Sequence, residues 1–196
     1  MEFSDLPATA AWRHGNTRTA LESVACERLT TGWLMTGSTT ALEAGAAWWV
    51  AYEIELDPSF RTRRAAISSR VGAGSPSNVV LTADGGGQWW LDGQRAARLD
   101  GCLDVDLESS AMTNALPIRR APVAMGTALD APAAYVRVDR LAVERLDQHY
   151  VRRDDGERGP IFDYCAPAFA FSSRISYDRS GLVVSYPGIA DRVEQS

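Results

Sequence analysis

Acidic and arginine side chains are concentrated in residues 101–120, between aliphatic residues. Asp104 and Asp106 alternate with leucine and valine, so a strand would place both carboxylates on one face. Arg119 and Arg120 follow one loop later. One hypothesis is an internal Asp–Arg bidentate ion pair that fixes the register of two neighbouring segments. The other leaves one guanidinium free to grip an anionic or polyhydroxylated head group, and because neighbouring strand residues face opposite sides, only one of the two arginines can do so.

The tryptophans are the second group that can recognise a ligand. All six precede residue 91. In alternating strands, Trp49 shares a face with Glu53, and Trp90 shares a face with Gln88. An indole beside a carboxylate or an amide suits a sugar, which offers an apolar ring face and hydroxyl groups. We therefore consider Trp12, Trp49 and Trp90 as stacking or cavity-lining groups, and the alternative is that they pack under another sheet layer.

Two amide side chains, Asn114 and Gln148, complete the candidate ligand site as neutral hydrogen-bonding groups. Asn114 also fits a turn before Pro117, because Asn side chains bond to nearby backbone groups. The chain has two histidines, His14 and His149, and no Gly-x-Ser-x-Gly elbow. No catalytic triad is therefore predicted, and no residue is assigned a catalytic role.

A carbohydrate-active hydrolase is the main enzymatic alternative. Such an enzyme would use two of the four carboxylates that alternate along strands: Glu53, Glu55, Asp104 and Asp106. Residues two apart on a strand are separated by about 7 Å, which overlaps the separations that glycosidases use. Alternating glutamates, however, usually form the solvent face of a strand. We therefore favour binding over hydrolysis.

Several other classes of protein are disfavoured by composition. All 20 basic residues are arginines, so a Schiff-base lysine and a phosphate-loop lysine are excluded. Three scattered cysteines and two distant histidines lack the spacing of a zinc site, and we expect neither a metal nor a cofactor. The net charge of −5 lacks the basic stripe that a nucleic acid requires.

The elements that must position these residues are mostly strands. Large apolar residues occupy the even positions of residues 48–56, which is the period of an amphipathic strand. Turn signals such as Asp92-Gly93 separate the strands and favour antiparallel hairpins. Residues 140–149 fit one short helix or an irregular strand. Further strands are expected near residues 21–29, 33–39, 65–71, 78–82, 88–91, 103–107, 123–129, 135–138, 169–177 and 182–186.

Residues 101–120, with Trp12-Arg13 near the start, Leu99-Asp100-Gly101 just before them and the run Gly-Leu-Val-Val-Ser-Tyr-Pro-Gly at 181–188, resemble the putative glycolipid-binding family. The resemblance spans nearly the whole chain. It implies a spiral β-roll and the binding of a lipid or glycolipid. A curved sheet of this kind can enclose an apolar cavity that suits acyl chains.

We therefore expect residues 1–196 to form one mainly β domain that binds a lipid or glycolipid without catalysis. The N-terminus does not resemble a secretory signal, and no run approaches the ~20 apolar residues of a membrane-spanning helix, so a cytoplasmic protein is expected. Asn114, Gln148 and one of Arg119 and Arg120 would hold the head group. A third hypothesis is a homo-oligomeric interaction module whose interface covers Trp49 and Trp90.

Overall fold

The computed structural model describes residues 3–15 and 18–193, and most of them lie in strands. The strands of the first half are β1 (Thr9–His14), β2 (Arg18–Leu29), β3 (Gly32–Glu43), β4 (Ala46–Leu56), β5 (Thr62–Val71), β6 (Ser77–Ala83), β7 (Trp89–Leu91), β8 (Gln94–Arg95) and β9 (Asp104–Leu107). Those of the second half are β10 (Ala128–Asp130), β11 (Ala133–Val136), β12 (Val143–Leu146), β13 (His149–Asp155), β14 (Pro160–Ala166), β15 (Phe171–Tyr177), β16 (Val183–Tyr186) and β17 (Ala190–Arg192). The helical elements are the 3-10 turns η1 (Ala97–Leu99), η2 (Met112–Asn114) and η3 (Pro167–Phe169) and the helix α1 (Ala115–Arg120).

One large sheet runs through both halves of the chain. Its order is β10-β13-β14-β15-β16-β17-β1-β2-β3-β4-β5-β6-β7-β8, and all of its neighbouring strands are antiparallel. The pairing of β1 with β17 joins the first strands to the last, which makes the two halves one domain. The sheet curves strongly but does not close, because β10 and β8 remain its two edges.

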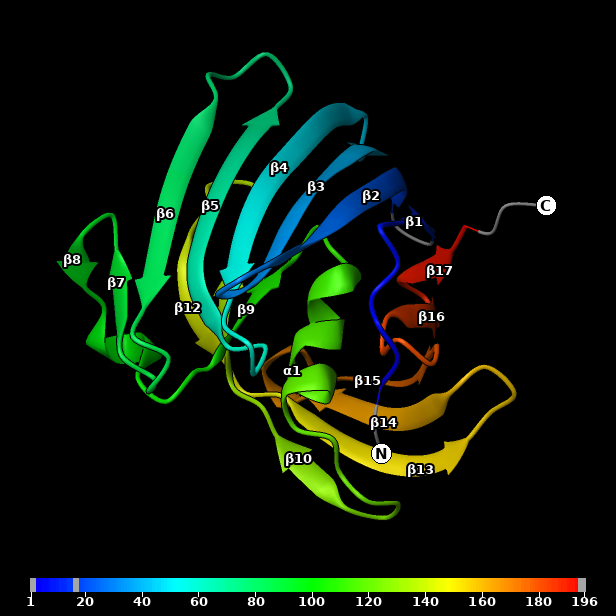
Figure 1. Cartoon of the computed structure of the whole chain (residues 1–196). Coiled ribbons are helices and arrows are strands. Elements are labelled where there is room, and N and C mark those ends of the chain that lie inside the picture. Colours follow the sequence, from blue (N-terminus) through cyan, green and yellow to red (C-terminus); the bar gives the residue numbers. More distant parts are fainter. Residues whose placement is uncertain (1–2, 16–17, 194–196) are drawn as a thin grey trace.

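A smaller sheet and α1 fill the hollow of the large sheet. The order of this second sheet is β12-β11-β9, and β9 and β11 are its parallel pair. Strands β2 to β6 arch over α1, and β13 to β15 pass below it (Figure 1). Strand β9 is covered on both faces, so all four of its residues are buried. Asp104 and Asp106 are therefore interior carboxylates, although their alternating pattern is that of a half-exposed strand.

The mainly β, antiparallel prediction is confirmed by the strand pattern. In β4 the even residues from Trp48 to Leu56 are buried, and Trp49 and Glu53 are exposed. Asp92 and Gly93 join β7 to β8 with positive φ angles of 47° and 78°, which a two-residue hairpin turn requires. Alternation therefore identified both the strand type and its buried face.

Two local predictions were wrong or incomplete, and the structure decides between two alternatives for a third segment. Residues 115–120 form the short helix α1 rather than a strand beside β9, and Pro117 fits because it lies in the first turn, where a missing N–H breaks no helical bond. Of the two alternatives for residues 140–149, the strand is correct: they contain β12, whose pairing with β11 satisfies its backbone groups. Residues 123–127 lie outside regular structure, and β10 starts only at Ala128.

Candidate functional site

A pocket of about 350 Å³ opens where the end of β9 meets β14, β15 and β16. Its walls come from segments that are far apart in sequence, which the curved sheet brings together. It is lined by Arg18, Asp106, Leu107, Glu108, Ser110, Asn114, Tyr135, Arg137, Leu146, Tyr164, Ala166, Phe169, Phe171, Tyr186 and Ile189. Carboxylate, amide, hydroxyl and aromatic groups therefore face one space.

Asp106 is the most deeply placed charged group of this pocket, with 8% of its surface exposed. Its carboxylate accepts hydrogen bonds from Thr113 Oγ1 at 2.9 Å and from Gln148 Nε2 at 2.5 Å. Both donors are neutral. Burial raises the pKa of Asp106 to about 6, and these two hydrogen bonds offset only part of that effect. The group can therefore exist as a carboxylic acid or as a carboxylate near neutral pH.

Amide and phenol groups surround Asp106 in a connected network. Gln148 Nε2 also donates to the Tyr164 hydroxyl at 3.1 Å, and the Tyr150 hydroxyl donates to Asn114 Oδ1 at 3.0 Å. Tyr177 fixes the same region by donating to the Asn114 carbonyl at 3.3 Å. The two amides that the sequence singled out thus both lie at this site. Asn114 lines the pocket, and Gln148 holds two of its lining residues.

Aromatic rings form the wall opposite β9. Tyr164 packs against Tyr186 at 5.7 Å between ring centroids, and their hydroxyls are hydrogen-bonded. Phe171 contacts both rings, at 6.2 Å and 6.0 Å. Burial raises the pKa values of the two tyrosines above the usual range, so they stay neutral. These rings offer apolar surface and hydroxyl groups side by side.

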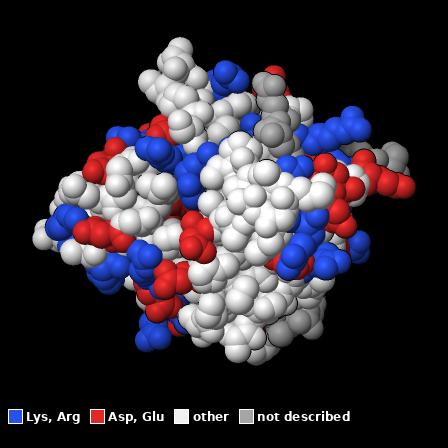
Figure 2. Space-filling view, turned by 90° about the horizontal axis from the view of Figure 1, so that it is seen from below, with Lys and Arg blue, Asp and Glu red and all other residues white. Residues whose placement is uncertain are grey.

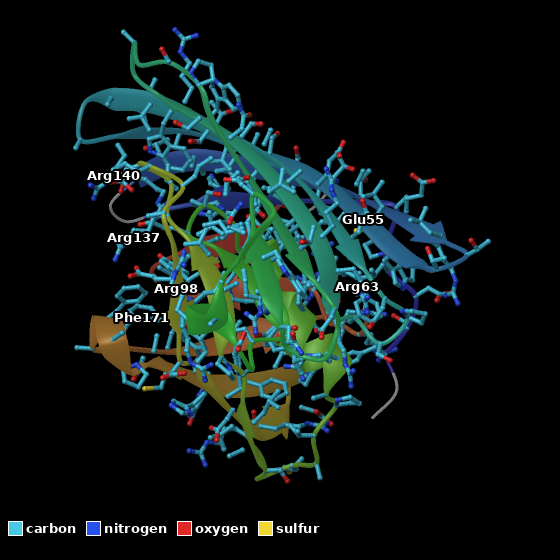
Figure 3. All side chains as sticks on the ribbon, turned by 90° about the vertical axis from the view of Figure 1, so that its left-hand side faces the viewer. Glu55, Arg63, Arg98, Arg137, Arg140 and Phe171 are labelled. Atoms are coloured by element: carbon cyan, nitrogen blue, oxygen red, sulfur yellow. The ribbon has the colours of Figure 1, made fainter. Side chains whose placement is uncertain are left out.

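Arginines lie at the mouth of the pocket. The Arg137 guanidinium lies 5.9 Å from the rings of both Tyr135 and Phe169 and forms an ion pair with Glu144 at 2.8 Å. Arg18 donates to the Glu108 carbonyl at 3.4 Å. Arg137 and Phe171 lie on the same side of the molecule, opposite Glu55 and Arg63 (Figure 3). The mouth therefore combines guanidinium groups with aromatic surface.

A buried carboxylate supports the pocket from behind. Glu22, which is fully buried, accepts hydrogen bonds from the Ser110 hydroxyl and from the backbone N–H of Ala111 at 2.8 Å. Tyr52 and His14 contact the same carboxylate at 3.2 Å and 3.0 Å. Ser110 lines the pocket, so Glu22 fixes the position of one of its walls.

The two arginines of α1 lie outside the pocket lining. Arg120 forms a bidentate pair with Asp104, with its Nη2 at 2.7 Å from Oδ2, which corresponds to the internal ion pair considered from the sequence. Arg119 donates to the carbonyls of Ser180 and Ser4. Its guanidinium lies 4.2 Å from the Phe60 ring, and burial lowers its pKa to about 10. Both groups thus bind protein atoms.

The three candidate tryptophans are also placed away from this pocket. Trp12 is fully buried and donates to the Val183 carbonyl at 2.8 Å. Trp49 lies on the outer face of β4 with 36% of its surface exposed. Trp90 lies on β7, with the Arg95 guanidinium 5.6 Å from its ring. We therefore centre the candidate site on Asp106, Asn114 and Gln148 instead.

Sequence reasoning missed the aromatic wall. Tyr164 lies at the end of the alternating strand β14, and Phe169 and Phe171 follow in the next turn and strand. A usable signal was present: residues 164–171 carry no charged side chain although 23% of the chain is charged. Tyr186 gave no comparable signal, because Tyr-Pro-Gly is typical of a strand end.

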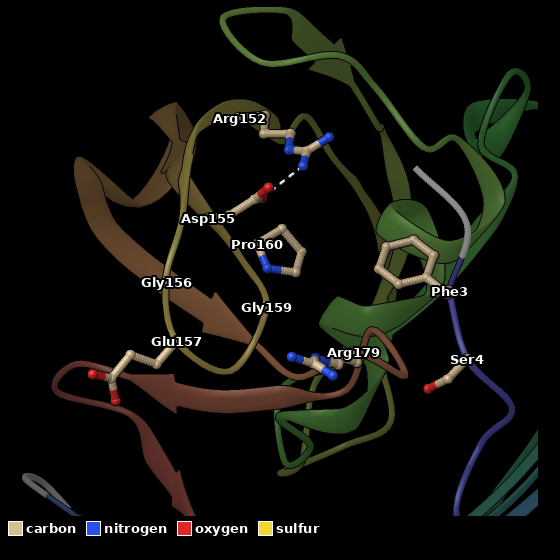
Figure 4. Close-up of a pocket in the computed structure, with 9 residues that line it drawn as sticks. All are labelled: Phe3, Ser4, Arg152, Asp155, Gly156, Glu157, Gly159, Pro160 and Arg179. Carbon is tan, nitrogen blue, oxygen red and sulfur yellow. Dashed lines mark hydrogen bonds and ion pairs between the residues drawn. The ribbon is translucent and has the colours of Figure 1, made fainter.

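A second hollow of about 810 Å³ lies near the N-terminus and the β13–β14 connection (Figure 4). The Arg179 side chain points into it, and Glu157 points away. Arg152 is held on its wall by Asp155 at 2.6 Å. Positive and negative groups alternate around an uncharged central area on the lower face of the molecule (Figure 2). The hollow lacks the buried, neutral hydrogen-bonding set of the Asp106 pocket, so we take the latter as the candidate site.

No group of histidine, cysteine and acidic residues suited to a metal ion occurs in residues 3–15 and 18–193. Within the same ranges, none of the helices combines the length and the apolar character needed to cross a bilayer.

The fold and the pocket define a mainly β protein, built on one large curved antiparallel sheet that encloses a hydrogen-bonding pocket. Residues 9–192 match the family described as "Putative glycolipid-binding", and the chain belongs to this family. The structure is similar to that of a DUF1089 family protein from Pseudomonas aeruginosa, with a TM-score of 0.77 and 27% identity, over 93% of this chain and 95% of that chain.

A beta-barrel-like protein of the domain of unknown function DUF1849 from Brucella abortus shares the fold at a TM-score of 0.52. Its identity to this chain is 7%, over 95% of this chain and 94% of that chain. No curated protein matches the chain. The family supports binding as the general function.

Proposed function

We propose that the protein binds the sugar head group of a glycolipid in the Asp106 pocket and does so without catalysis. The observation that carries this proposal is a buried acid held by neutral groups beneath aromatic rings. A sugar offers hydroxyls to Asp106, Asn114 and Tyr164, and an apolar ring face to Phe171. The chemistry of the ligand thus matches both kinds of wall.

Size favours the head group over the acyl chains as the occupant. The pocket volume is about 350 Å³. Small-molecule sites usually have volumes of about 300–1,000 Å³, so this pocket lies at the small end of that range. A monosaccharide head group fits, whereas two long chains exceed the space. This proposal replaces the acyl-chain cavity expected from the sequence.

The experiment is a calorimetric titration with n-octyl glucoside and n-octyl galactoside below their micelle concentrations. We expect saturable binding that Tyr164→Phe weakens roughly fivefold to tenfold, because one hydrogen bond contributes about 1 kcal/mol. Asp106→Asn, which keeps the shape of the side chain, should weaken binding by a similar factor.

Ser68→Ala is the matched control, since it removes a hydroxyl that donates to Asn78 and does not line the pocket. Equal affinities in the wild type, Tyr164→Phe and Asp106→Asn would place the sugar elsewhere. No binding of either glycoside by the folded wild type would contradict the proposed head-group function.

Hydrolysis of the glycosidic bond is a second candidate, because Glu108 lies in the same pocket as Asp106. The pKa of Asp106, raised by burial to about 6, suits a general acid. Glu108 Oε2 accepts a hydrogen bond from the Val138 N–H at 2.8 Å. The carboxylates Glu53 and Glu55 lie on β4 instead, and Glu55 contacts Arg64 at 3.3 Å.

Release of nitrophenol from 4-nitrophenyl glycosides separates binding from hydrolysis. Turnover that Asp106→Asn and Glu108→Gln both abolish would establish an enzyme. Binding without turnover at acidic and neutral pH would support the non-catalytic function.

A further inference from the structure

The turn between β14 and β15 presents an exposed apolar surface. Its four residues, Pro167, Ala168, Phe169 and Ala170, are all exposed, and none carries a polar side chain. We call this group the apolar tip. Phe169 is 42% exposed, and its ring lies 5.4 Å from the Tyr135 ring between centroids. The tip therefore leaves a large ring in contact with solvent.

The apolar tip is continuous with the candidate site. Phe169 itself lines the Asp106 pocket, and Phe171 follows it in the wall. Arg137 lies 5.9 Å from the Phe169 ring, on the same side of the molecule as Arg140 and Phe171 (Figure 3). A surface that seats against the tip would cover the mouth of the pocket.

At this mouth Arg137 is already paired with Glu144 at 2.8 Å, so Arg18 is the guanidinium that can meet an anionic group of a docked surface. The described contacts of the Arg18 guanidinium are the Glu108 carbonyl at 3.4 Å and the Trp48 ring at 5.5 Å, and neither is an anion. Arginine beside aromatic side chains is typical of surfaces that rest at the lipid–water interface. The charge and the apolar ring thus fit the phosphate and acyl layers of a bilayer.

We propose that the apolar tip docks on a lipid bilayer, so that the Asp106 pocket receives a sugar head group while the acyl chains stay in the membrane. This inference rests on the proposed function, because it concerns how a glycolipid reaches the same pocket. The pocket volume of about 350 Å³ is small for a ligand site, which favours a head group in the pocket and the chains outside it. The apolar tip supplies the contact that holds the protein at the membrane surface.

Co-sedimentation with vesicles tests the docking. The vesicles contain phosphatidylcholine with a minor fraction of phosphatidylglycerol and are prepared with and without monoglucosyl diacylglycerol. We expect Phe169→Ser to lower partitioning to the glycolipid vesicles roughly tenfold, which corresponds to about 1.4 kcal/mol for an inserted phenylalanine. Met125→Ser is the matched control, because Met125 is 60% exposed and does not line the pocket.

Octyl glucoside binding, measured on the same variants, separates the two proposals. Docking is supported if Phe169→Ser loses vesicle binding and if Ala168→Asp, in the apolar tip but outside the pocket lining, also loses vesicle binding while it keeps its glycoside affinity within about twofold. Glycoside binding without vesicle binding would overturn docking and leave the head-group function intact. Vesicle binding that depends on Phe169, without binding of octyl glucoside, would support docking and overturn the head-group function.

Two further outcomes overturn the docking. One is equal vesicle partitioning of the wild type and Phe169→Ser. The other is a dimer in sedimentation velocity that Phe169→Ser converts to a monomer, because the tip would then be covered by a second copy of the chain.

Discussion

Gln148 links Asp106 to Tyr164: its side-chain nitrogen donates to the Asp106 carboxylate at 2.5 Å and to the Tyr164 hydroxyl at 3.1 Å. The donor comes from the segment between β12 and β13, the acid from β9 and the phenol from β14. One amide therefore sets the spacing between the acidic floor and the aromatic wall of the candidate site.

Gln148→Leu should disturb both sides of this link. It leaves the buried Asp106 with one of its two side-chain donors, so we expect about 1–3 kcal/mol of destabilisation. The pKa of Asp106 should rise further, because a bond to its charged form is lost. Urea unfolding and the NMR titration of Asp106 measure the two effects. Gln94→Leu, on an exposed position of β8, is the control and should change neither.

Asp106 should make stability fall as the pH rises. Its folded pKa of about 6 lies above the ordinary value of 3.8, so between these values the folded state binds more protons than the unfolded state. Its stabilising contribution is present below the unfolded pKa and is lost as the pH rises through about 6. About two pKa units correspond to an upper limit of about 3 kcal/mol.

Unfolding of Asp106→Asn across this pH range measures the contribution. The free energy of unfolding should fall less steeply with pH in the variant. A part of the pH dependence remains, because the pKa of Asp104 is also raised by burial. Asp163→Asn gives the comparison of opposite sign. Arg153 holds the pKa of Asp163 below its ordinary value, so that exposed acid favours folding as the pH rises. An unchanged slope in Asp106→Asn would show that the acid is not buried as described.

Arg120→Ala should be among the most damaging single changes. It leaves the Asp104 carboxylate, which is 1% exposed, without its bidentate partner, and breaking a buried pair costs about 3–5 kcal/mol. The double variant Arg120→Leu with Asp104→Leu should recover much of this loss, because both charges are removed. Urea midpoints of the single and double variants measure it. A loss below about 0.5 kcal/mol would mean that solvent reaches Asp104.

The sequence predicted the strands better than their environment. Alternation in β4 gave both the strand and its buried face, because that strand faces solvent on one side. The same alternation in β9 placed Asp104 and Asp106 on one face, and the structure buries this face and pairs Asp104 with Arg120 of α1. No local sequence pattern predicts that α1 covers β9, because Arg119 and Arg120 give this segment a polar character.

The residues of the candidate site also differ in how well the sequence predicted them. Asn114 and Gln148 were selected as neutral hydrogen-bonding groups, and both lie at the pocket, where Gln148 bonds to Asp106. Trp49 and Trp90 were selected because each shares a strand face with a carboxylate or an amide, and neither of them lines the pocket. Tyr186 reaches the pocket because β16 pairs with β15 and β17. The local sequence does not show this strand order, so it could not predict Tyr186.

Glu22→Gln should destabilise the support of the pocket although it is nearly isosteric. Glu22 Oε2 faces the Ala111 N–H at 2.8 Å, and Oε1 faces the Met112 N–H at 3.4 Å. Either orientation of the glutamine therefore turns its NH₂ group toward a backbone donor, and one buried N–H loses its acceptor. We expect about 1–3 kcal/mol of destabilisation. Glycoside affinity should weaken as well, because Ser110 loses its fixed position.

Glu27→Gln, at an exposed position of the same strand, is the matched control and should leave stability within about 0.5 kcal/mol of the wild type. Urea unfolding, together with hydrogen exchange at the amides of Ala111 and Met112, measures the loss. Faster exchange at these two amides, with Glu27→Gln unchanged, would show that Glu22 holds the Ser110 wall. Exchange that is slow in both variants would assign that wall to its packing instead.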